Sequence, residues 1–419
     1  MPLASFTVER YRSFVRPTRV ALRPLTLLFG YNSAGKSALL RALPLLAASS
    51  GGATLGPLAL DAEVAREATY KEIRTRLKPG SDLMLAAAWD DDLYPVRQVE
   101  VHLRADNDRS HVVDRLVLRD AAGSEIVRAT DVPGEPGRYQ VEASGEPTAI
   151  GELPFEGVRP APRADLQLSP GLRAGLEAGA ARLVSLQEAV HWLGAVRASP
   201  ERNPRYQGVP ARLGGTGKRA GDRLAYDHQG AGKLFPEVES AVRKMFGHRL
   251  VVRDEQDKYA LELEPFDGLP VRVSIVDAGE GITQVLPVLV LGAMARAGDL
   301  GVGAVLALEQ PEMHLHPQAE RALATFLCDI AAASTRPRML VETHSENLLL
   351  SVQLEVARGR LSPADVSILW VEVQADGQSQ LREVTLDAEG RPSGWPPGVF
   401  SEDAEIAREL FLARRNPRS

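Results

Sequence analysis

Eight residues, from Gly30 to Ser37, have the types and spacing needed to bind the phosphates of a nucleotide. They follow the P-loop pattern, in which a glycine and four further residues precede Gly-Lys-Ser. Backbone N–H groups at a helix start would cradle phosphates, Lys36 would reach the β- and γ-phosphates, and the Ser37 hydroxyl would ligate magnesium. The alternative is a chance glycine-rich turn. The candidate binding residues are Gly30, Asn32, Ser33, Ala34, Gly35, Lys36 and Ser37.

A second motif places carboxylates after an apolar run at 305–308, which is followed by Glu309-Gln310-Pro311-Glu312. An apolar strand that delivers acidic side chains to a sheet edge is what a Walker B strand does, and magnesium prefers oxygen ligands. Glu309 is therefore the candidate metal ligand beside Ser37. Glu309, Gln310 and Glu312 are candidate catalytic residues. The alternative is a buried strand that ends in a polar turn.

A third motif is the short strand that ends in Thr343-His344-Ser345. On a neighbouring parallel strand, His344 could reach a γ-phosphate or the attacking water. The alternative is a capping turn, since serine is a good helix N-cap.

A fourth motif, Asp277 to Gln284, is a glycine-rich turn that opens a helix. Helix N-termini bind anions well, so Gly279, Gly281 and Thr283 are candidate phosphate-binding residues. An ordinary left-handed turn is the alternative.

The elements that must position these motifs are indicated by hydrophobic periodicity and turn residues. Strands are predicted at 4–9 and 19–29, and the helix after the P-loop should be kinked or shortened by Pro44. Alternating residues from 98 to 129 predict antiparallel hairpins, and residues 132–170 read as an irregular linker. Further predicted helices are 171–195, 281–297, 317–334 and 344–358, and further strands are 249–253, 259–264, 270–276, 303–308, 338–342 and 366–373.

This alternation predicts an α/β fold with a mixed sheet, an antiparallel β subdomain and a helical, loop-rich insertion. The P-loop and the Walker B strand are about 270 residues apart, yet they must meet at one magnesium ion. We therefore expect one split head domain. Its parts are an N-terminal lobe (1–145), an insertion (146–247), a C-terminal lobe (248–360) and a small mixed strand and helix appendage (361–419).

The composition limits the classes of protein. The chain has 419 residues, 44% of them hydrophobic, and a formal net charge of −6, so a uniformly basic nucleic-acid coat is excluded. With one cysteine, Cys328, neither an intrachain disulfide nor a cysteine-based metal site can form. The longest apolar stretch, 285–295, is too short to span a membrane and early arginines interrupt any signal peptide, so we expect a cytoplasmic protein.

Taken in order, the motifs resemble those of ABC-type heads, and more narrowly the RecF/SMC-like ATPases of the overcoming-lysogenization-defect superfamily. Residues 8–14, which include Arg12, resemble the family's N-terminal segment, and residues 193–197 resemble a recurrent Leu-Gly-Pro-Leu-Arg segment. The 277–284 turn is similar to the signature motif, and the 342–345 turn is similar to the switch-histidine loop. Arg12 thereby becomes a further candidate nucleotide-binding residue.

The resemblance implies a homodimer in which two heads sandwich two ATP molecules with magnesium. Gln310 stands where typical heads have glutamate, and glutamine cannot take a proton, so hydrolysis is expected to be slow. The family also implies a partner effector, DNA as a possible ligand, and phage defence as a setting. Two alternatives stay open, namely a nucleotide-sensing module with negligible hydrolysis and a self-contained nuclease, although no Asp-x-Asp pair follows Glu372.

Overall fold

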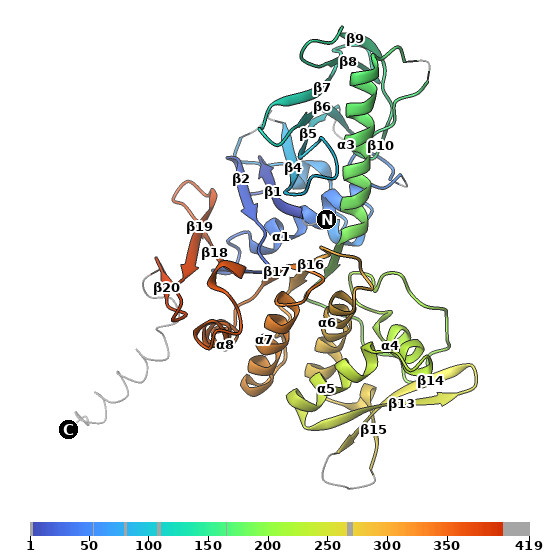
Figure 1. Ribbon diagram of the computed structural model, residues 1–419, viewed down its shortest axis with the longest axis vertical. Coiled ribbons are helices and arrows are strands. Elements are labelled where there is room, and N and C mark those ends of the chain that lie inside the picture. The colour runs from blue at the N-terminus through green and yellow to red at the C-terminus, as the bar shows by residue number, and fades with distance from the viewer. Residues whose placement is uncertain are drawn as a thin grey trace, which may run out of the picture.

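The computed structural model describes residues 3–52, 54–78, 82–106, 110–164, 166–265 and 271–396. A seven-stranded sheet lies at its centre, in the order β12-β16-β17-β3-β18-β19-β20 (Figure 1). The first five of these strands are parallel, and β19 and β20 are antiparallel. The bounds are β12 Val190–Leu193, β16 Val305–Glu309, β17 Arg338–Glu342, β3 Leu25–Gly30, β18 Val366–Val373, β19 Ser379–Leu386 and β20 Pro392–Ser393.

Helices cover both faces of this sheet because its parallel strands are apolar on both sides. Side chains of β3 contribute to two cores, one on each face of the sheet. Leu25 and Leu27 belong to the core shared with the helical lobe, whereas Leu28 belongs to the core around α1 (Lys36–Ser49). The helices of that lobe are α4 (Ala220–Gln229), α5 (Leu234–Phe246), α6 (Glu280–Ala297), α7 (Pro317–Ala331) and α8 (Glu346–Ala357).

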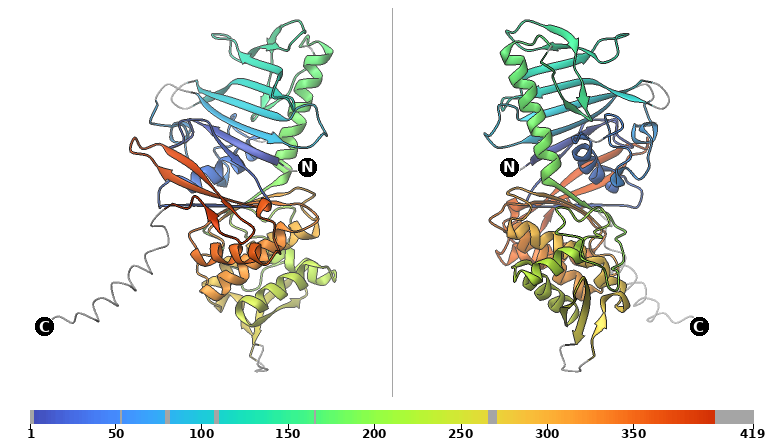
Figure 2. Two further views of the ribbon diagram at one scale, coloured as in Figure 1. Left: turned by 60° about the vertical axis from the view of Figure 1, so that its left-hand side comes forward. Right: turned by 90° about the vertical axis from the view of Figure 1, so that its right-hand side faces the viewer.

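Helix α1 (Lys36–Ser49) follows the P-loop and lies between the central sheet and a second sheet (Figure 1). The second sheet is antiparallel, with eight strands in the order β2-β1-β4-β5-β6-β7-β8-β9. The long helix α3 (Pro170–Ala189) crosses one of its faces (Figure 2). The strands are β1 Leu3–Glu9, β2 Thr18–Ala21, β4 Leu83–Trp89, β5 Gln98–Ala105, β6 His111–Arg119, β7 Glu125–Asp131, β8 Arg138–Glu142 and β9 Ala149–Glu152.

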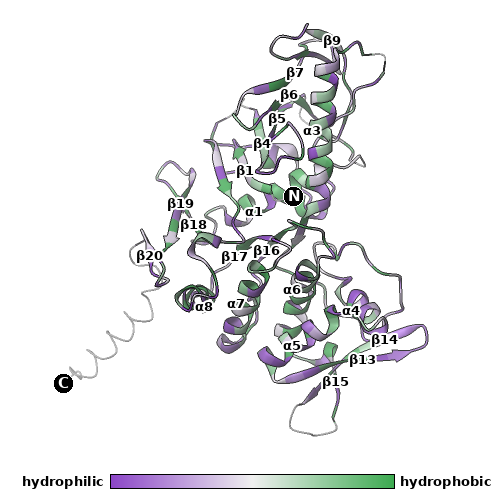
Figure 3. Ribbon diagram, viewed as in Figure 1, coloured by the Kyte–Doolittle hydropathy of each residue, from purple (hydrophilic) through white to green (hydrophobic). Residues whose placement is uncertain are grey.

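At the opposite end of the molecule, a small antiparallel sheet accompanies α4 and α5. It contains β13 (His248–Glu255), β14 (Lys258–Pro265) and β15 (Val273–Ser274), and its hairpin is mostly hydrophilic in Figure 3. The short elements are η1 Glu63–Ala65, α2 Tyr70–Ile73, β10 Phe155–Glu156, β11 Arg159–Pro160, η2 Ile275–Asp277 and η3 Pro363–Asp365.

The structure confirms the predicted α/β class with an antiparallel subdomain and corrects several element assignments. The predicted helix 171–195 ends at Ala189, because residues 190–193 pair in parallel with β16 instead. The predicted irregular segment 132–170 contains β8 and β9, which extend the antiparallel sheet. Pro44 lies inside α1 without ending it, since the helix continues to Ser49.

The C-terminal segment is built into the central sheet rather than appended to it. Strand β18 pairs in parallel with the P-loop strand β3, and β19 pairs with β18. Residues 397–419, the remainder of the predicted strand and helix appendage, lie outside the described residues. None of the helices in the described ranges is long and apolar enough to cross a membrane.

Candidate functional site

The P-loop leaves β3 through a tightly enclosed glycine. Gly30 has φ of 148°, and a Cβ atom there would lie 2.3 Å from the backbone oxygen of Val371 on β18. Gly35, with φ of 103°, starts α1, and a Cβ atom there would lie 2.9 Å from Ser13 Oγ. Only glycine fits both positions, because they combine positive φ with close neighbours. Between them, Asn32 and Ser33 are exposed and Ala34 is buried.

Lys36 is the buried cation of the loop, with 4% of its surface exposed. Its Nζ donates hydrogen bonds to the backbone oxygens of Gly30 (2.9 Å) and Tyr31 (2.8 Å). Burial lowers the pKa of Lys36, and the nearby Glu342 carboxylate opposes that shift. The ammonium therefore binds carbonyl oxygens of the loop. Phosphate oxygens are charged and would be stronger partners for this cation.

The carboxylate that Ser37 bonds to is Glu342 and not Glu309. Ser37 Oγ donates a 2.7 Å hydrogen bond to Glu342 Oε1, at the end of β17. Strand β17 lies between β16 and β3, and the register places Glu342 beside Leu28 on one side and Glu309 on the other. The carboxyl ends of three parallel strands thus bring the P-loop serine, Glu342 and Glu309 to one edge.

Glu309 is almost fully buried, with 1% of its side chain exposed, and its oxygens have protein partners. Arg41, on α1, donates from Nε to Glu309 Oε1 (2.7 Å) and from Nη2 to Oε2 (2.5 Å). Trp192 Nε1 donates to Oε1 at 2.8 Å, and Arg66 lies 3.8 Å from Oε2. The side chain chosen from the sequence as the metal ligand is therefore held in a two-pronged ion pair.

Glu312 links the Walker B turn to the switch-histidine loop. Its Oε1 accepts hydrogen bonds from Thr343 Oγ1 (2.7 Å) and from the backbone N–H of His344 (3.0 Å). Burial raises the pKa of Glu312, whereas burial and then the charge of Lys36 lower the pKa of His344. His344 itself is exposed, and Ser345 caps α8 by accepting from Leu348 N at 2.9 Å. The capping alternative and an accessible histidine thus coexist.

The 277–284 segment is exposed at its start and anchored at its end. Asp277 pairs with Arg202 through two 2.6 Å hydrogen bonds, while Gly279 is open to solvent. Gly281 packs close to the Walker B turn, since a Cβ atom there would lie 2.7 Å from His314 O. Thr283 is buried, with its hydroxyl bonded to Glu280 O. Thr283 is therefore bonded within the first turn of its own helix, and Gly279 is the open position of the three candidates.

Arg12 belongs to a short turn, 11–14, that packs against the P-loop. It is half-buried with φ of 53°, and its backbone N–H donates to Ile73 O. Ser379, at the start of β19, fastens this turn to the loop, because its Oγ donates to Ala34 O and is also hydrogen-bonded to Ser13 Oγ, both at 2.7 Å. No spacing rule relates Ser379 to a motif more than 340 residues away, so only its tertiary position reveals it.

Arg197 is a second residue whose position the sequence did not explain. It is 3% exposed and joins the start of α6 to the end of β16 through its guanidinium, which donates to Gln284 O (3.2 Å) and Glu309 O (2.5 Å). Burial lowers its pKa to about 10. The resemblance of residues 193–197 to a family segment could have pointed to Arg197 from the sequence. No sequence pattern pointed to Arg41 or Trp192.

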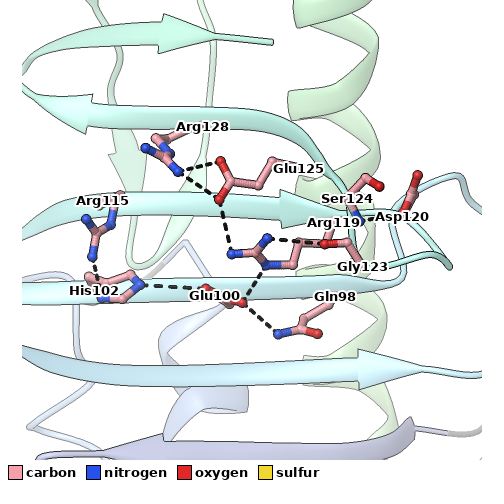
Figure 4. Close-up of polar contacts among 10 residues, drawn as sticks. All are labelled: Gln98, Glu100, His102, Arg115, Arg119, Asp120, Gly123, Ser124, Glu125 and Arg128. Carbon is pink, nitrogen blue, oxygen red and sulfur yellow. Dashed lines mark hydrogen bonds and ion pairs between the residues drawn. The ribbon is translucent and has the colours of Figure 1, made fainter. Parts of the chain in front are cut away.

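The arginine-rich face of the antiparallel sheet is charge-balanced (Figure 4). Arg119 bonds to Glu100 at 2.8 Å and lies 3.1 Å from Glu125, which also pairs with Arg128. Burial raises the pKa of Glu100, but hydrogen bonds from His102 and Arg119 outweigh it and leave that pKa at about 2. Arg119 and Arg128 have carboxylate partners and Arg115 contacts His102 Nδ1 at 3.2 Å, so these three arginines do not form an unpaired cationic patch for a phosphate backbone.

The residues at the P-loop fit a magnesium ion bound together with nucleotide. Magnesium is held by one or two protein oxygens plus phosphates and water, rather than by an all-protein cage. Accordingly, no group of three or more His, Cys, Asp or Glu that could hold a metal occurs within the described ranges. Glu342 Oε2 is a buried carboxylate oxygen with no hydrogen-bond partner among the described residues, so an oxygen suited to a cation is present.

Comparisons with known proteins bear on the domain type and the fold. Residues 199–351 match a family model described as "AAA domain, putative AbiEii toxin, Type IV TA system", and no curated protein matches the chain. The match spans about a third of the chain and includes the 277–284 segment, the Walker B strand and His344.

The chain is similar to solved structures of SMC heads. An SMC head bound to the C-winged helix domain of ScpA is 11% identical, with a TM-score of 0.53 over 92% of this chain and 98% of that one. An Smc head with an extended coiled coil, bound to the C-terminal domain of ScpA derived from Pyrococcus furiosus, is 10% identical with a TM-score of 0.48 over 98% and 99%. The Thermotoga maritima SMC head is 11% identical with a TM-score of 0.42 over 91% and 98%. The likeness with a TM-score of 0.53 shows that the chain has the P-loop fold of an SMC head, and residues 199–351 are similar to an AAA domain.

Proposed function

We propose that this protein is a magnesium-dependent ATPase that acts as a dimeric nucleotide switch. One observation carries the proposal, namely the meeting of Lys36, Ser37 and Glu342 at the carboxyl ends of β3 and β17. There, the buried ammonium of Lys36 suits the negative phosphates, and the hydroxyl of Ser37 and the carboxylate of Glu342 suit the magnesium ion. When bound, magnesium would neutralise charge on the β- and γ-phosphates, and Ser37 with a neighbouring glutamate would hold it.

The exposed start of α6 supports the proposed dimer. Gly279 is open to solvent, and the contacts of the 277–284 segment run to Arg202, His314 and Arg197. A helix N-terminus that faces outward can supply its N–H groups to a nucleotide bound by a second copy. We propose that Gly279 and Gly281 of one chain complete the ATP site of the other.

Hydrolysis is proposed to be slow. Gln310 can orient a water but cannot accept its proton. Glu312 holds the backbone N–H of His344 and keeps one oxygen, Oε2, unpartnered among the described residues, so it is the available carboxylate of the Walker B turn. Gln310 also favours the second candidate, a nucleotide sensor with negligible turnover.

A partner protein is proposed as the output of the switch. The similar SMC head is bound to the C-winged helix domain of ScpA, so a head of this fold can dock another protein. On the antiparallel sheet, Arg119 is paired with Glu100 and Glu125, and this charge pairing favours a protein over DNA at that face. An effector encoded nearby, as in phage-defence loci, would fit the resemblance of the motifs.

Measurement of phosphate release by the purified chain distinguishes an ATPase from a nucleotide sensor with negligible turnover. We expect ATP- and magnesium-dependent release that Lys36→Ala abolishes, and sedimentation should show a dimer with a non-hydrolysable ATP analogue and a monomer without it. Nucleotide binding with release equal to that of the Lys36→Ala variant would make the protein a sensor. An unchanged monomer in both conditions would refute the switch.

A further inference from the structure

We propose that Glu342, and not the Walker B residue Glu309, is the protein carboxylate that ligates the magnesium ion of the bound nucleotide. The inference rests on the proposed function, because it concerns the metal of the same P-loop site. It assigns a metal-binding role to the residue that precedes the Thr-His-Ser turn.

The contact between Ser37 and Glu342 has the geometry of a shared cation site. Adjacent ligands of an octahedral magnesium at about 2.1 Å from the ion lie about 3 Å apart. Ser37 Oγ and Glu342 Oε1 are 2.7 Å apart, so an ion could take both oxygens with a small separation of the two side chains.

Glu342 also has an unmet requirement that a cation would satisfy. The residue is 2% exposed, and its Oε2 has no hydrogen-bond partner among the described residues. A buried oxygen left unpaired is costly, and a buried carboxylate is normally paired or metal-bound. Of the basic groups near Glu342, Lys36 is already bonded to the carbonyls of Gly30 and Tyr31, and Arg41 is bonded to Glu309.

Glu309, in contrast, has its oxygens engaged. Three hydrogen bonds from Arg41 and Trp192 satisfy them, and the side chain is 1% exposed. To ligate magnesium, Glu309 would have to give up a two-pronged bond to a guanidinium. Glu342 would give up one hydroxyl hydrogen bond, and that hydroxyl would become a ligand of the same ion.

The test measures how strongly magnesium and nucleotide assist each other's binding. The affinity of the full chain for a fluorescent ATP analogue is titrated in EDTA and in saturating magnesium, and the ratio of the two dissociation constants is the coupling. Glu342→Gln and Glu309→Gln are compared as isosteric variants. Glu355→Gln is the matched control, because Glu355 is another buried glutamate but lies on α8 and pairs with Arg360.

We expect Glu342→Gln to reduce the coupling about tenfold or more, while affinity in EDTA is unchanged or tighter because a negative charge near the phosphates is lost. Glu309→Gln should reduce the coupling less, and Glu355→Gln should leave it unchanged. Coupling within twofold of wild type in Glu342→Gln, or an equal or larger loss in Glu309→Gln, would overturn the assignment. Wild type that binds no nucleotide in either condition would refute the proposed function itself.

Discussion

The ion pair between Arg41 and Glu309 should be a strong determinant of stability, and Arg41→Met tests this. The change leaves a carboxylate with 1% of its surface exposed and without its cation. Breaking a buried pair by removing one partner costs about 3–5 kcal/mol, because the remaining charge stays desolvated. The retained hydrogen bond from Trp192 and the nearby Arg66 favour the lower end, about 3 kcal/mol.

A second substitution should reverse most of that loss. Glu309→Gln in the Arg41→Met background removes the buried charge and keeps an oxygen for Trp192. Replacing both members of a buried pair is often nearly neutral, so the double variant should lie within about 1 kcal/mol of wild type. The coupling between the sites would then be about 2 kcal/mol or more.

Urea unfolding of the wild type, both single variants and the double variant, followed by circular dichroism, gives the four free energies of this cycle. Arg41→Ala would confuse lost packing with lost charge, so methionine is the better choice because it retains an apolar stem. A cost of less than about 1 kcal/mol for Arg41→Met, or a double variant as unstable as Arg41→Met, would show that the ion pair is not a strong determinant of stability.

Four further outcomes are expected. His344→Ala should lower phosphate release about 100-fold with nucleotide affinity retained, and lost affinity would make His344 structural. Since burial and Lys36 lower the pKa of His344, wild-type turnover should persist below the usual histidine pKa and fall only in stronger acid. Burial raises the pKa of Glu312, so the stability that this carboxyl group contributes is complete in acid and is lost as pH rises through that pKa. The stability of Glu312→Gln relative to wild type, measured by urea unfolding, should therefore increase as pH rises above the usual glutamate pKa, and a pH-independent difference would contradict this. Gly30→Ala should weaken nucleotide binding at least about tenfold, because its Cβ would meet Val371 O; normal affinity would show that the loop can shift.

Much of the site could be predicted from the sequence because each motif is contiguous. Gly30 to Ser37 must form one loop, and an apolar strand before it and a helix after it are local properties of the chain. The capping role of Ser345 also follows from short-range chemistry. Parallel strands that alternate with helices gave the α/β class, which the structure and the SMC-head likeness confirm.

The pairing of these motifs was decided only by the tertiary structure. Insertion of β17 between β16 and β3 brings Glu342 rather than Glu309 to Ser37, and a strand order cannot be read from periodicity. The same holds for β18 and Ser379, which a linear reading placed in an appendage but which border the P-loop. Local sequence determines where a carboxylate or hydroxyl lies along its strand, whereas register and strand order determine which of them share one buried edge.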